Sequence, residues 1–238
     1  VILLKQLLAD NENLIEVGSN IGTHTIPLAK QVLNGGFVYA IEPQYQNHKL
    51  LLDNIKNNEL KNVKVLKIAI SSKEGKAYMN TFDESITGNY GDSKIFSSNF
   101  KNAESVPVKT LDQLFYDDIK ERKSIKLIKC DAQGQELNII LGSKKMIDEY
   151  KPYLYLENDD IHTSKALIEN IKNMGYILFW HLPPLYNPDN FLKNTKNIFP
   201  KIISCNMLCI HRSTKIKLNE IWKKFEITDS NYHPYKKT

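Results

Sequence analysis

The 238-residue sequence contains very little arginine: Arg122 and Arg212 are the only two among its 32 basic residues. Because the planar guanidinium is the side chain that reads guanine edges and phosphates through paired hydrogen bonds, a lysine-based surface argues against sequence-specific nucleic-acid binding. Cysteine is also scarce, and Cys130, Cys205 and Cys209 show no CxxC spacing. We therefore expect buried, reduced thiols and a cytoplasmic protein without a nucleic-acid partner.

Long apolar runs are absent as well, since none reaches the roughly 18 residues that a membrane span requires. The opening VILLKQLLAD is apolar, but it contains Lys5 and Asp10, and no small-residue cleavage site follows it. We interpret it as a core helix instead of a signal peptide. At the other end, residues 212–238 carry seven bases and three acids, and we expect this Lys-rich extension to be a solvated tail, with contact to an acidic partner as the alternative.

The apolar content, 42% of residues, is sufficient for one sizeable core, and the charged share of 25% excludes general disorder. Short apolar runs alternate with amphipathic stretches. This alternation predicts a single α/β domain over residues 1–238, with its core at about 12–211 and a mostly parallel sheet covered by helices on both faces. The expected strands are Leu14–Val17, Phe37–Ile41, Val63–Ile70, Ile125–Cys130, Tyr153–Leu156, Tyr176–Trp180 and Ser204–Ile210, the last two as an antiparallel pair, and the clearest helices are Gln46–Asn57, Gln135–Tyr150 and Ser164–Met174.

Two segments are too long and too polar to be ordinary connections between such elements. Residues 83–105 contain scattered glycine and serine, and residues 183–200 are rich in proline and asparagine. Segments of this length are either functional lids or disordered. If they are lids, we expect both to lie on the acceptor side of a ligand site.

The most informative segment is LIEVGSNIGTHT at residues 14–25. It predicts a strand that ends in an acid, Glu16, followed by a turn containing Gly18 and Gly22 and then by the start of a helix. The next strand ends at Glu42, twenty residues after Gly22. A carboxylate at that position can accept both hydroxyls of a ribose. The pattern therefore predicts a nucleoside-containing ligand at the carboxyl edge of the sheet.

This turn differs from the dinucleotide-binding pattern GxGxxG, because Asn20 stands at the second glycine and Glu16 adds a negative charge. A carboxylate repels a pyrophosphate but attracts an ammonium, and S-adenosylmethionine carries an ammonium, a sulfonium and a ribose without phosphate. We therefore expect S-adenosylmethionine, the alternatives being a nicotinamide cofactor or a tight turn without a ligand. The expected cofactor-binding residues are Glu16, Gly18, Ser19, Asn20, Gly22, Thr23, Glu42, Pro43, Ala69 and Asp131, of which Ala69 would line an adenine pocket.

A second informative segment, IKLIKCDAQGQEL at residues 125–137, brings Asp131 to the same edge of the sheet. A carboxylate at the mouth of a ligand site usually contributes to binding or catalysis. The following strand ends at Glu157, with further acids and His162 beyond it. Their spacing matches no tight metal-binding signature, so we interpret them as a solvated edge and expect no metal.

Together these segments resemble the FkbM-type methyltransferases, a family of S-adenosylmethionine-dependent O-methyltransferases. The similarity runs over about residues 14–211, and the matching segments are Glu16–Thr25, Ile41–Asn57, Val108–Leu114, Ile125–Gly142, Tyr153–Glu157 and Ser204–Cys209. The family usually reads Asp-Val-Glu-Gly-x-Glu where this sequence has Asp131, Gln133 and Glu136, so a role that needs an acid at position 133 does not carry over. The resemblance implies a Rossmann-like class I methyltransferase sheet with an antiparallel last strand.

The resemblance also implies methyl transfer to a hydroxyl of a sugar, a glycan or a glycosylated metabolite. Because sugar hydroxyls are poor nucleophiles near neutral pH, we expect a positioned base. Asp131 is the first candidate, either as the base or as a residue that only orients the cofactor, and Glu157 and His24 are the second candidates. The main alternative is a catalytically degenerate methyltransferase fold that binds a glycan or a partner protein, which Gln133 favours. Oligomeric state is not predicted.

Overall fold

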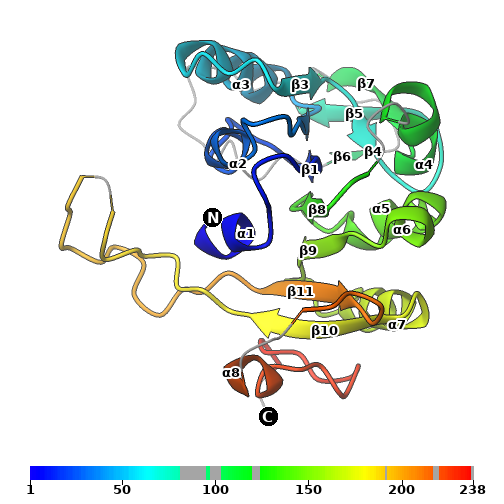
Figure 1. The fold of residues 1–238 in the computed structure, drawn as a ribbon, viewed down its shortest axis with the longest axis vertical. Helices are drawn as coiled ribbons and strands as arrows, with labels where there is room; N and C mark the ends of the chain where they lie inside the picture. The colour runs from blue at the N-terminus through cyan, green and yellow to red at the C-terminus, as the bar shows by residue number, and fades with distance from the viewer. Residues whose placement is uncertain (81–94, 97–102, 120–123, 191, 217–219, 237–238) are drawn as a thin grey trace.

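The computed structural model describes residues 1–238 except 81–94, 97–102, 120–123, 191, 217–219 and 237–238. The described chain contains a seven-stranded sheet with the order β10-β11-β9-β8-β1-β2-β3 (Figure 1). Its strands are β1 (Leu14–Val17), β2 (Val38–Ile41), β3 (Val63–Leu66), β8 (Leu127–Cys130), β9 (Tyr153–Glu157), β10 (Tyr176–His181) and β11 (Asn206–His211). Among these strands, only β11 runs in the opposite direction to the others, so it pairs antiparallel with both β9 and β10. The predicted mostly parallel sheet with an antiparallel last strand is confirmed.

Helices cover both faces of this sheet and bury a separate core on each. One core packs α1 (Ile2–Gln6), α2 (Thr25–Gln31) and α3 (Tyr45–Asn57) against the sheet, and the other packs α5 (Glu136–Leu141), α6 (Lys144–Tyr150) and α7 (Ser164–Asn173). Successive strand residues alternate between the cores, so Leu14 belongs to the first and Ile15 to the second. This burial on both sides explains why the predicted strands are continuous apolar runs.

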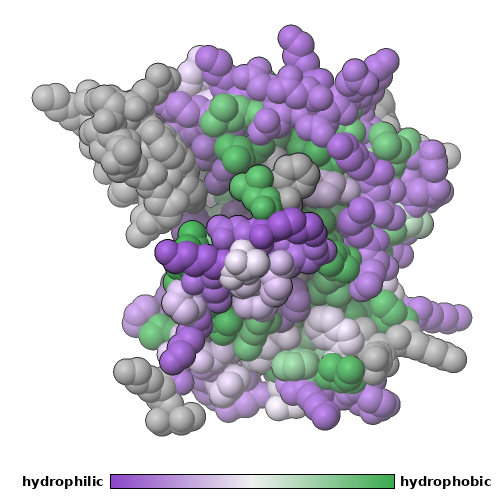
Figure 2. All heavy atoms as spheres, turned by 90° about the vertical axis from the view of Figure 1, so that its left-hand side faces the viewer, coloured by the Kyte–Doolittle hydropathy of each residue, from purple (hydrophilic) through white to green (hydrophobic). Residues whose placement is uncertain are grey.

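The outer surface of α3 shows how the helices divide their residues. Its buried positions are Asn47, Leu51 and Ile55. Its remaining positions are mostly polar but include the exposed Tyr45, Leu50 and Leu52. Figure 2 views the protein from the left-hand side of Figure 1, and hydrophilic residues cover much of the upper part of this view, where α3 lies. None of the described helices is both long and apolar enough to cross a bilayer.

A second, four-stranded sheet was not predicted. It contains β4 (Ala69–Ile70), β7 (Ala103–Lys109), β5 (Gly75–Asn80) and β6 (Ile95–Phe96), in that order. The expected strand Val63–Ile70 is therefore wrong in its second half, because β3 ends at Leu66 and Ala69–Ile70 pairs with β7 instead. The intervening Lys67-Ile68 contains neither glycine nor proline, so the sequence gives no sign that the chain changes sheets there.

The expected helix Gln135–Tyr150 is also wrong, because α5 and α6 are separate helices that meet at Gly142-Ser143. A Cβ atom on Gly142 would lie 2.2 Å from the carbonyl oxygen of Ser71, so only glycine fits between α5 and the second sheet. The short helix α4 (Leu111–Leu114), which continues into a π-helical turn at Phe115–Ile119, holds the junction from the other side. The N–H of Asp112 donates to the Gly142 carbonyl at 3.0 Å, and the Asp112 carboxylate accepts the N–H of Met146 at 2.9 Å.

The described residues of the C-terminal extension are mostly exposed, as its charge predicts, but the chain also packs against the sheet. After α8 (Glu220–Lys223), the chain returns along the outer edge of β10 (Figure 1). The N–H of Trp180 donates to the carbonyl of Phe225 at 2.8 Å, and the N–H of Ile227 donates to the carbonyl of Leu178 at 2.8 Å. His233 is buried further on. Ile227 and His233 thus anchor the chain by their burial, while the described lysines of the extension remain exposed to solvent.

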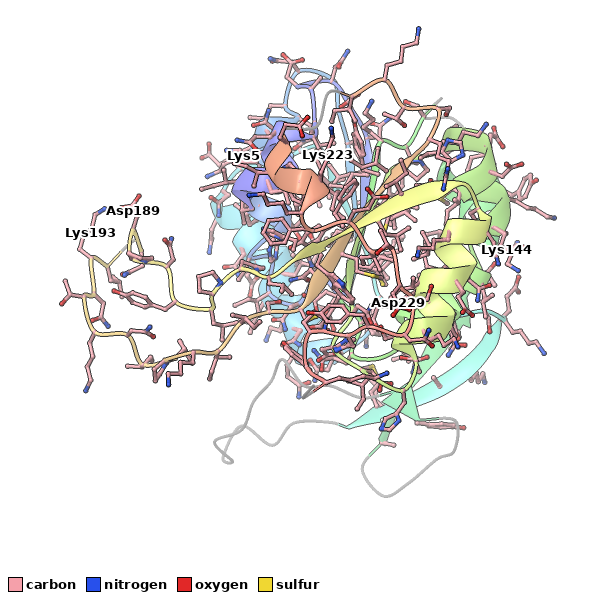
Figure 3. The ribbon with its side chains drawn as sticks, turned by 90° about the horizontal axis from the view of Figure 1, so that it is seen from below. Lys5, Lys144, Asp189, Lys193, Lys223 and Asp229 are labelled. Atoms are coloured by element: carbon pink, nitrogen blue, oxygen red, sulfur yellow. The ribbon has the colours of Figure 1, made fainter. Side chains whose placement is uncertain are left out.

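The two long segments differ in what the structure describes of them. Within residues 83–105, positions 83–94 and 97–102 lie outside the described residues, and the remainder belongs to β6 and β7. Residues 182–203 run out from β10 and return to β11, projecting away from the body of the protein (Figures 1 and 3). A bridge between Pro184 and Ile203 closes the base of this projection, and the ion pair of Asp189 and Lys193 lies at its outer end.

Candidate active site

A pocket of about 280 Å³ lies at the carboxyl edge of β1, β2 and β8. This is the edge at which open α/β sheets bind ligands. The predicted residues that line it are Gly18, Asn20, Thr23, His24, Glu42, Pro43, Ala69 and Asp131. Glu16, Ser19, Gly22 and Glu157 do not line it. None of the described residues of 183–200 belongs to the lining either, so that segment does not cover this pocket.

The turn after β1 forms the floor of the pocket. The N–H groups of Gly18 and Ser19 both donate to the carbonyl of Ile41 at 3.0 Å, which ties the turn to the end of β2. Gly18 has φ +77°, and a Cβ atom there would lie 1.8 Å from the carbonyl oxygen of Asp131. Glycine is therefore required at this position both for its backbone conformation and for the close approach of β1 and β8.

Glu42 stands directly after β2 and is buried at the edge of the pocket. Its Oε2 accepts the N–H of Asn20 at 2.8 Å and its Oε1 accepts the N–H of Gln44 at 3.0 Å. Asn20 makes the first contact from a left-handed conformation with φ +50°, which asparagine tolerates well. Burial raises the pKa of the Glu42 carboxyl to about 7, although the two N–H groups oppose that rise.

An apolar wall closes the pocket beside Glu42. Ile68, Ala69 and Ile70 supply it from the connection after β3 and from β4, and Met79 supplies it from β5. Ala69 was predicted from the sequence, whereas Met79 was not. The position of Met79 depends on the second sheet, for which the sequence showed no sign.

Glu16 does not face the pocket as the sequence analysis assumed. It is 1% exposed, its Oε2 accepts the hydroxyl of Thr25 at 2.5 Å, and its Oε1 lies 3.2 Å from Nζ of Lys129. The carboxylate that was expected to attract a cationic ligand is thus already paired with a lysine of the protein itself. Register explains the contact, since Glu16 and Lys129 are Cα partners on the adjacent strands β1 and β8.

Lys129 is the site residue that sequence reasoning missed. Its side chain is 3% exposed, and its Nζ also lies 3.5 Å from Oδ2 of Asp131. Burial alone would lower the pKa of Lys129, but the charges of Glu16 and Asp131 outweigh it and raise that pKa. The sequence did contain a clue to this pair, because each of the two apolar strands includes one charged residue. In a sheet that is buried on both faces, such a residue requires a partner of opposite charge.

Asp131 and Glu157 bring two carboxyl groups together at the ends of β8 and β9. Asp131 lines the pocket, with 39% of its side chain exposed, and its charge acts on the carboxyl group of Glu157. Burial, followed by the charge of Asp131, raises the pKa of Glu157 to about 9. At neutral pH the pair therefore holds a proton on Glu157 and presents Asp131 to the pocket.

The sharp turn that follows β8 places Gln133 in the pocket lining with φ +51°. Glu136 supports this turn, because its Oε1 accepts the N–H of Ala132 at 2.7 Å. Burial raises the pKa of Glu136 to about 7. His24, which also lines the pocket, is held neutral, since burial, followed by the charge of Lys129, lowers its pKa to about 3. In the described part of the chain, no three or more His, Cys, Asp or Glu side chains are arranged to hold a metal ion.

Solved structures show the same fold at low sequence identity. An FkbM methyltransferase from Methylobacillus flagellatus matches 84% of this chain with a TM-score of 0.55 and 17% identity, and this chain spans only 44% of that protein. A precorrin-6y C5,15-methyltransferase from Geobacter metallireducens matches 88% with a TM-score of 0.54 and 12% identity, over 84% of its own length. A SAM-dependent O-methyltransferase from Thermotoga maritima matches 91% with a TM-score of 0.50 and 12% identity, over 66% of its own length.

These likenesses establish a Rossmann-like class I methyltransferase fold. No curated protein matches the chain in sequence. The sequence pattern of the methyltransferase FkbM domain, however, matches residues 16–178, which include the pocket-lining turns after β1 and β8 as well as Glu42 and Glu157. The chain belongs to the FkbM methyltransferase family.

Proposed function

We propose that the pocket binds S-adenosylmethionine and that the protein transfers its methyl group to a hydroxyl of a sugar, a glycan or a glycosylated metabolite. The observation that carries the cofactor assignment is Glu42, a buried carboxylate at the end of β2 that two backbone N–H groups hold at the edge of the pocket. Both Glu42 oxygens retain lone pairs, so they can accept the two ribose hydroxyls.

The lining fits the rest of this cofactor better than a dinucleotide. Ile68, Ala69 and Met79 offer an apolar surface for the adenine ring beside Glu42. Asp131 and Glu42, which line the pocket together with Gly18, place negative charge around the turn after β1. A pyrophosphate would be repelled there, whereas a sulfonium is attracted.

When bound, the cofactor supplies an electrophilic methyl group for in-line displacement by the acceptor oxygen. In that displacement an oxygen–carbon bond forms, the carbon–sulfur bond breaks, and the hydroxyl proton must leave. We assign the proton to Asp131, which faces the pocket while Glu157 behind it already holds one. His24 also lines the pocket, as a neutral imidazole, and is the second candidate.

The cofactor assignment is tested by calorimetric titration with S-adenosylhomocysteine, with NADH as the competing ligand. We expect micromolar binding of the former and no binding of the latter. Glu42→Ala should abolish this binding, and Glu42→Gln should weaken it while leaving an acceptor for the Asn20 N–H. Glu149→Ala, which changes an exposed carboxylate on α6, is the control and should bind as the wild type does.

The acceptor is tested by transfer of a labelled methyl group to a panel of mono- and oligosaccharides, with amines and catechols as the competing classes. Methylated sugar hydroxyl as the main product supports the proposal, and a preference for either competing class contradicts it. If S-adenosylhomocysteine does not bind to well-folded protein, the degenerate binding module that Gln133 favours becomes the better account.

A further inference from the structure

Among the described residues that line the pocket, Lys129 is the one side chain with a permanent positive charge. The other basic side chain, His24, is neutral at ordinary pH because burial and then the charge of Lys129 lower its pKa to about 3. The remaining lining is apolar, neutral and polar, or acidic. One ammonium group in an otherwise neutral and acidic pocket favours a ligand that carries one anionic group.

The position of this charge is fixed by two carboxylates. Nζ of Lys129 lies 3.2 Å from Oε1 of Glu16 and 3.5 Å from Oδ2 of Asp131. An ammonium has three N–H donors, and these two neighbours account for two of them. The third remains for a ligand, and the side chain reaches the pocket even though it is only 3% exposed. Glu16 is 1% exposed and lies next to the lysine ammonium as its buried partner.

The strand order separates this cation from the ribose site. Glu42 follows β2 on one side of β1, whereas Lys129 lies in β8 on the other side. The turn at Gly18 lies between them at the end of β1. A ligand whose ribose rests on Glu42 and whose chain crosses this turn brings its far end to Lys129.

We propose that Lys129 binds the α-carboxylate of the cofactor's amino-acid end, and that Glu16 is a positioning residue that holds the lysine ammonium toward the pocket. This inference rests on the proposed binding of S-adenosylmethionine, whose only anionic group is that carboxylate. The charges also balance, because the cluster of two carboxylates and one ammonium has a formal charge of −1 and the cofactor carries +1. The inference reverses the role that the sequence suggested for Glu16.

The test compares two ligands that differ only in this carboxylate, S-adenosylhomocysteine and its decarboxylated analogue. Calorimetric titration of the wild type should show a preference for S-adenosylhomocysteine of about tenfold or more, the scale of a hydrogen bond to a charged partner. Lys129→Met should reduce that preference to within about twofold, mainly by weakening S-adenosylhomocysteine. Lys126→Met, which removes a lysine one residue before β8 that pairs with Glu12, should leave it unchanged.

A second variant guards against loss of folding, because Lys129→Met leaves Glu16 buried without its partner. The double variant Glu16→Gln/Lys129→Met removes both charges and should show the same loss of preference, with far-UV circular dichroism and a cooperative melt as folding controls. Retention of the full preference in either folded variant, or the lack of any preference in the wild type, would overturn the inference. If the wild type binds neither compound, the cofactor assignment itself is wrong.

Discussion

The backbone N–H of Asn20 donates to Oε2 of Glu42 at 2.8 Å, and this bond joins the turn after β1 to the carboxyl end of β2. It places the floor of the pocket and its acidic edge in one rigid unit, since the same turn also bonds to the carbonyl of Ile41. The ligand site is therefore formed mainly before any ligand arrives.

The first prediction concerns the pH dependence of binding. Burial raises the pKa of Glu42 to about 7. A protonated carboxyl keeps fewer acceptor sites than a carboxylate, so full pairing with both ribose hydroxyls below that pH requires loss of a proton. We expect the affinity for S-adenosylhomocysteine to fall by up to about tenfold from pH 8 to pH 6, measured by calorimetry. Glu42→Gln should give a flat profile. Glu136→Gln should retain the slope, although the pKa of Glu136 is also raised to about 7. A flat wild-type profile would contradict the assignment.

The second prediction separates binding from chemistry at Asp131. Asp131→Asn keeps the size of the side chain but cannot accept a proton as the carboxylate does. We expect turnover with an identified acceptor to fall at least about tenfold, while S-adenosylhomocysteine affinity changes by less than about threefold. Steady-state kinetics and calorimetry on the same preparation measure both. Undiminished turnover would remove Asp131 from catalysis.

The third prediction concerns Glu157 and stability. Its pKa is raised to about 9, so between the unfolded value near 4.5 and pH 9 the folded chain keeps a proton that the unfolded chain has released. Stability contributed by this group is therefore present at low pH and is lost as the pH rises through that interval. Glu157→Gln removes the effect. The Tm of the variant minus the Tm of the wild type should therefore be at least about 2 °C larger at pH 8.5 than at pH 6. Glu149→Gln, an exposed control, should show no such trend. An equal difference at both pH values would argue against a protonated Glu157.

The fourth prediction contrasts two glycines. A Cβ atom on Gly142 would lie 2.2 Å from the Ser71 carbonyl oxygen, whereas a Cβ atom on Gly75 would meet nothing within 4 Å. We expect Gly142→Ala to lower the free energy of unfolding by about 1–3 kcal/mol through forced separation of α5 from the second sheet. Gly75→Ala should be neutral or stabilising by a few tenths of a kcal/mol. Denaturant titration of both variants measures the free energy of unfolding. Equal values for the two variants would contradict the prediction and show that the junction of α5 and α6 adjusts to the added methyl group.

The sequence predicted the main sheet well because its strands are buried on both faces. Apolar runs such as Leu14–Val17 and Tyr153–Leu156 have no competing interpretation in a chain that alternates with amphipathic helices. The second sheet was missed because its strands are short or half-exposed, and β4 continues an apolar run that begins in β3. The break between α5 and α6 was visible as Gly142, but an isolated glycine also occurs inside helices.

The candidate site was predicted at the level of strand ends and turns but not at the level of charge pairing. Glu42 and Asp131 line the pocket because the ends of parallel strands meet at one edge. The pairing of Glu16 with Lys129 depends on the register of β1 against β8, between residues 113 positions apart. No local sequence pattern encodes that register. The sequence therefore predicted that Glu16 binds the ligand, whereas in the structure Lys129 is its partner.

The return of the chain along β10 has a consequence for association between copies of this protein. β10 is an edge strand of the seven-stranded sheet. An uncovered edge strand presents unpaired backbone N–H and carbonyl groups with which another chain can pair. Phe225 and Ile227 already occupy the N–H of Trp180 and the carbonyl of Leu178. The segment Phe225–Ile227 therefore covers this edge of the sheet, and a second chain could pair with β10 at Leu178 and Trp180 only by displacing it.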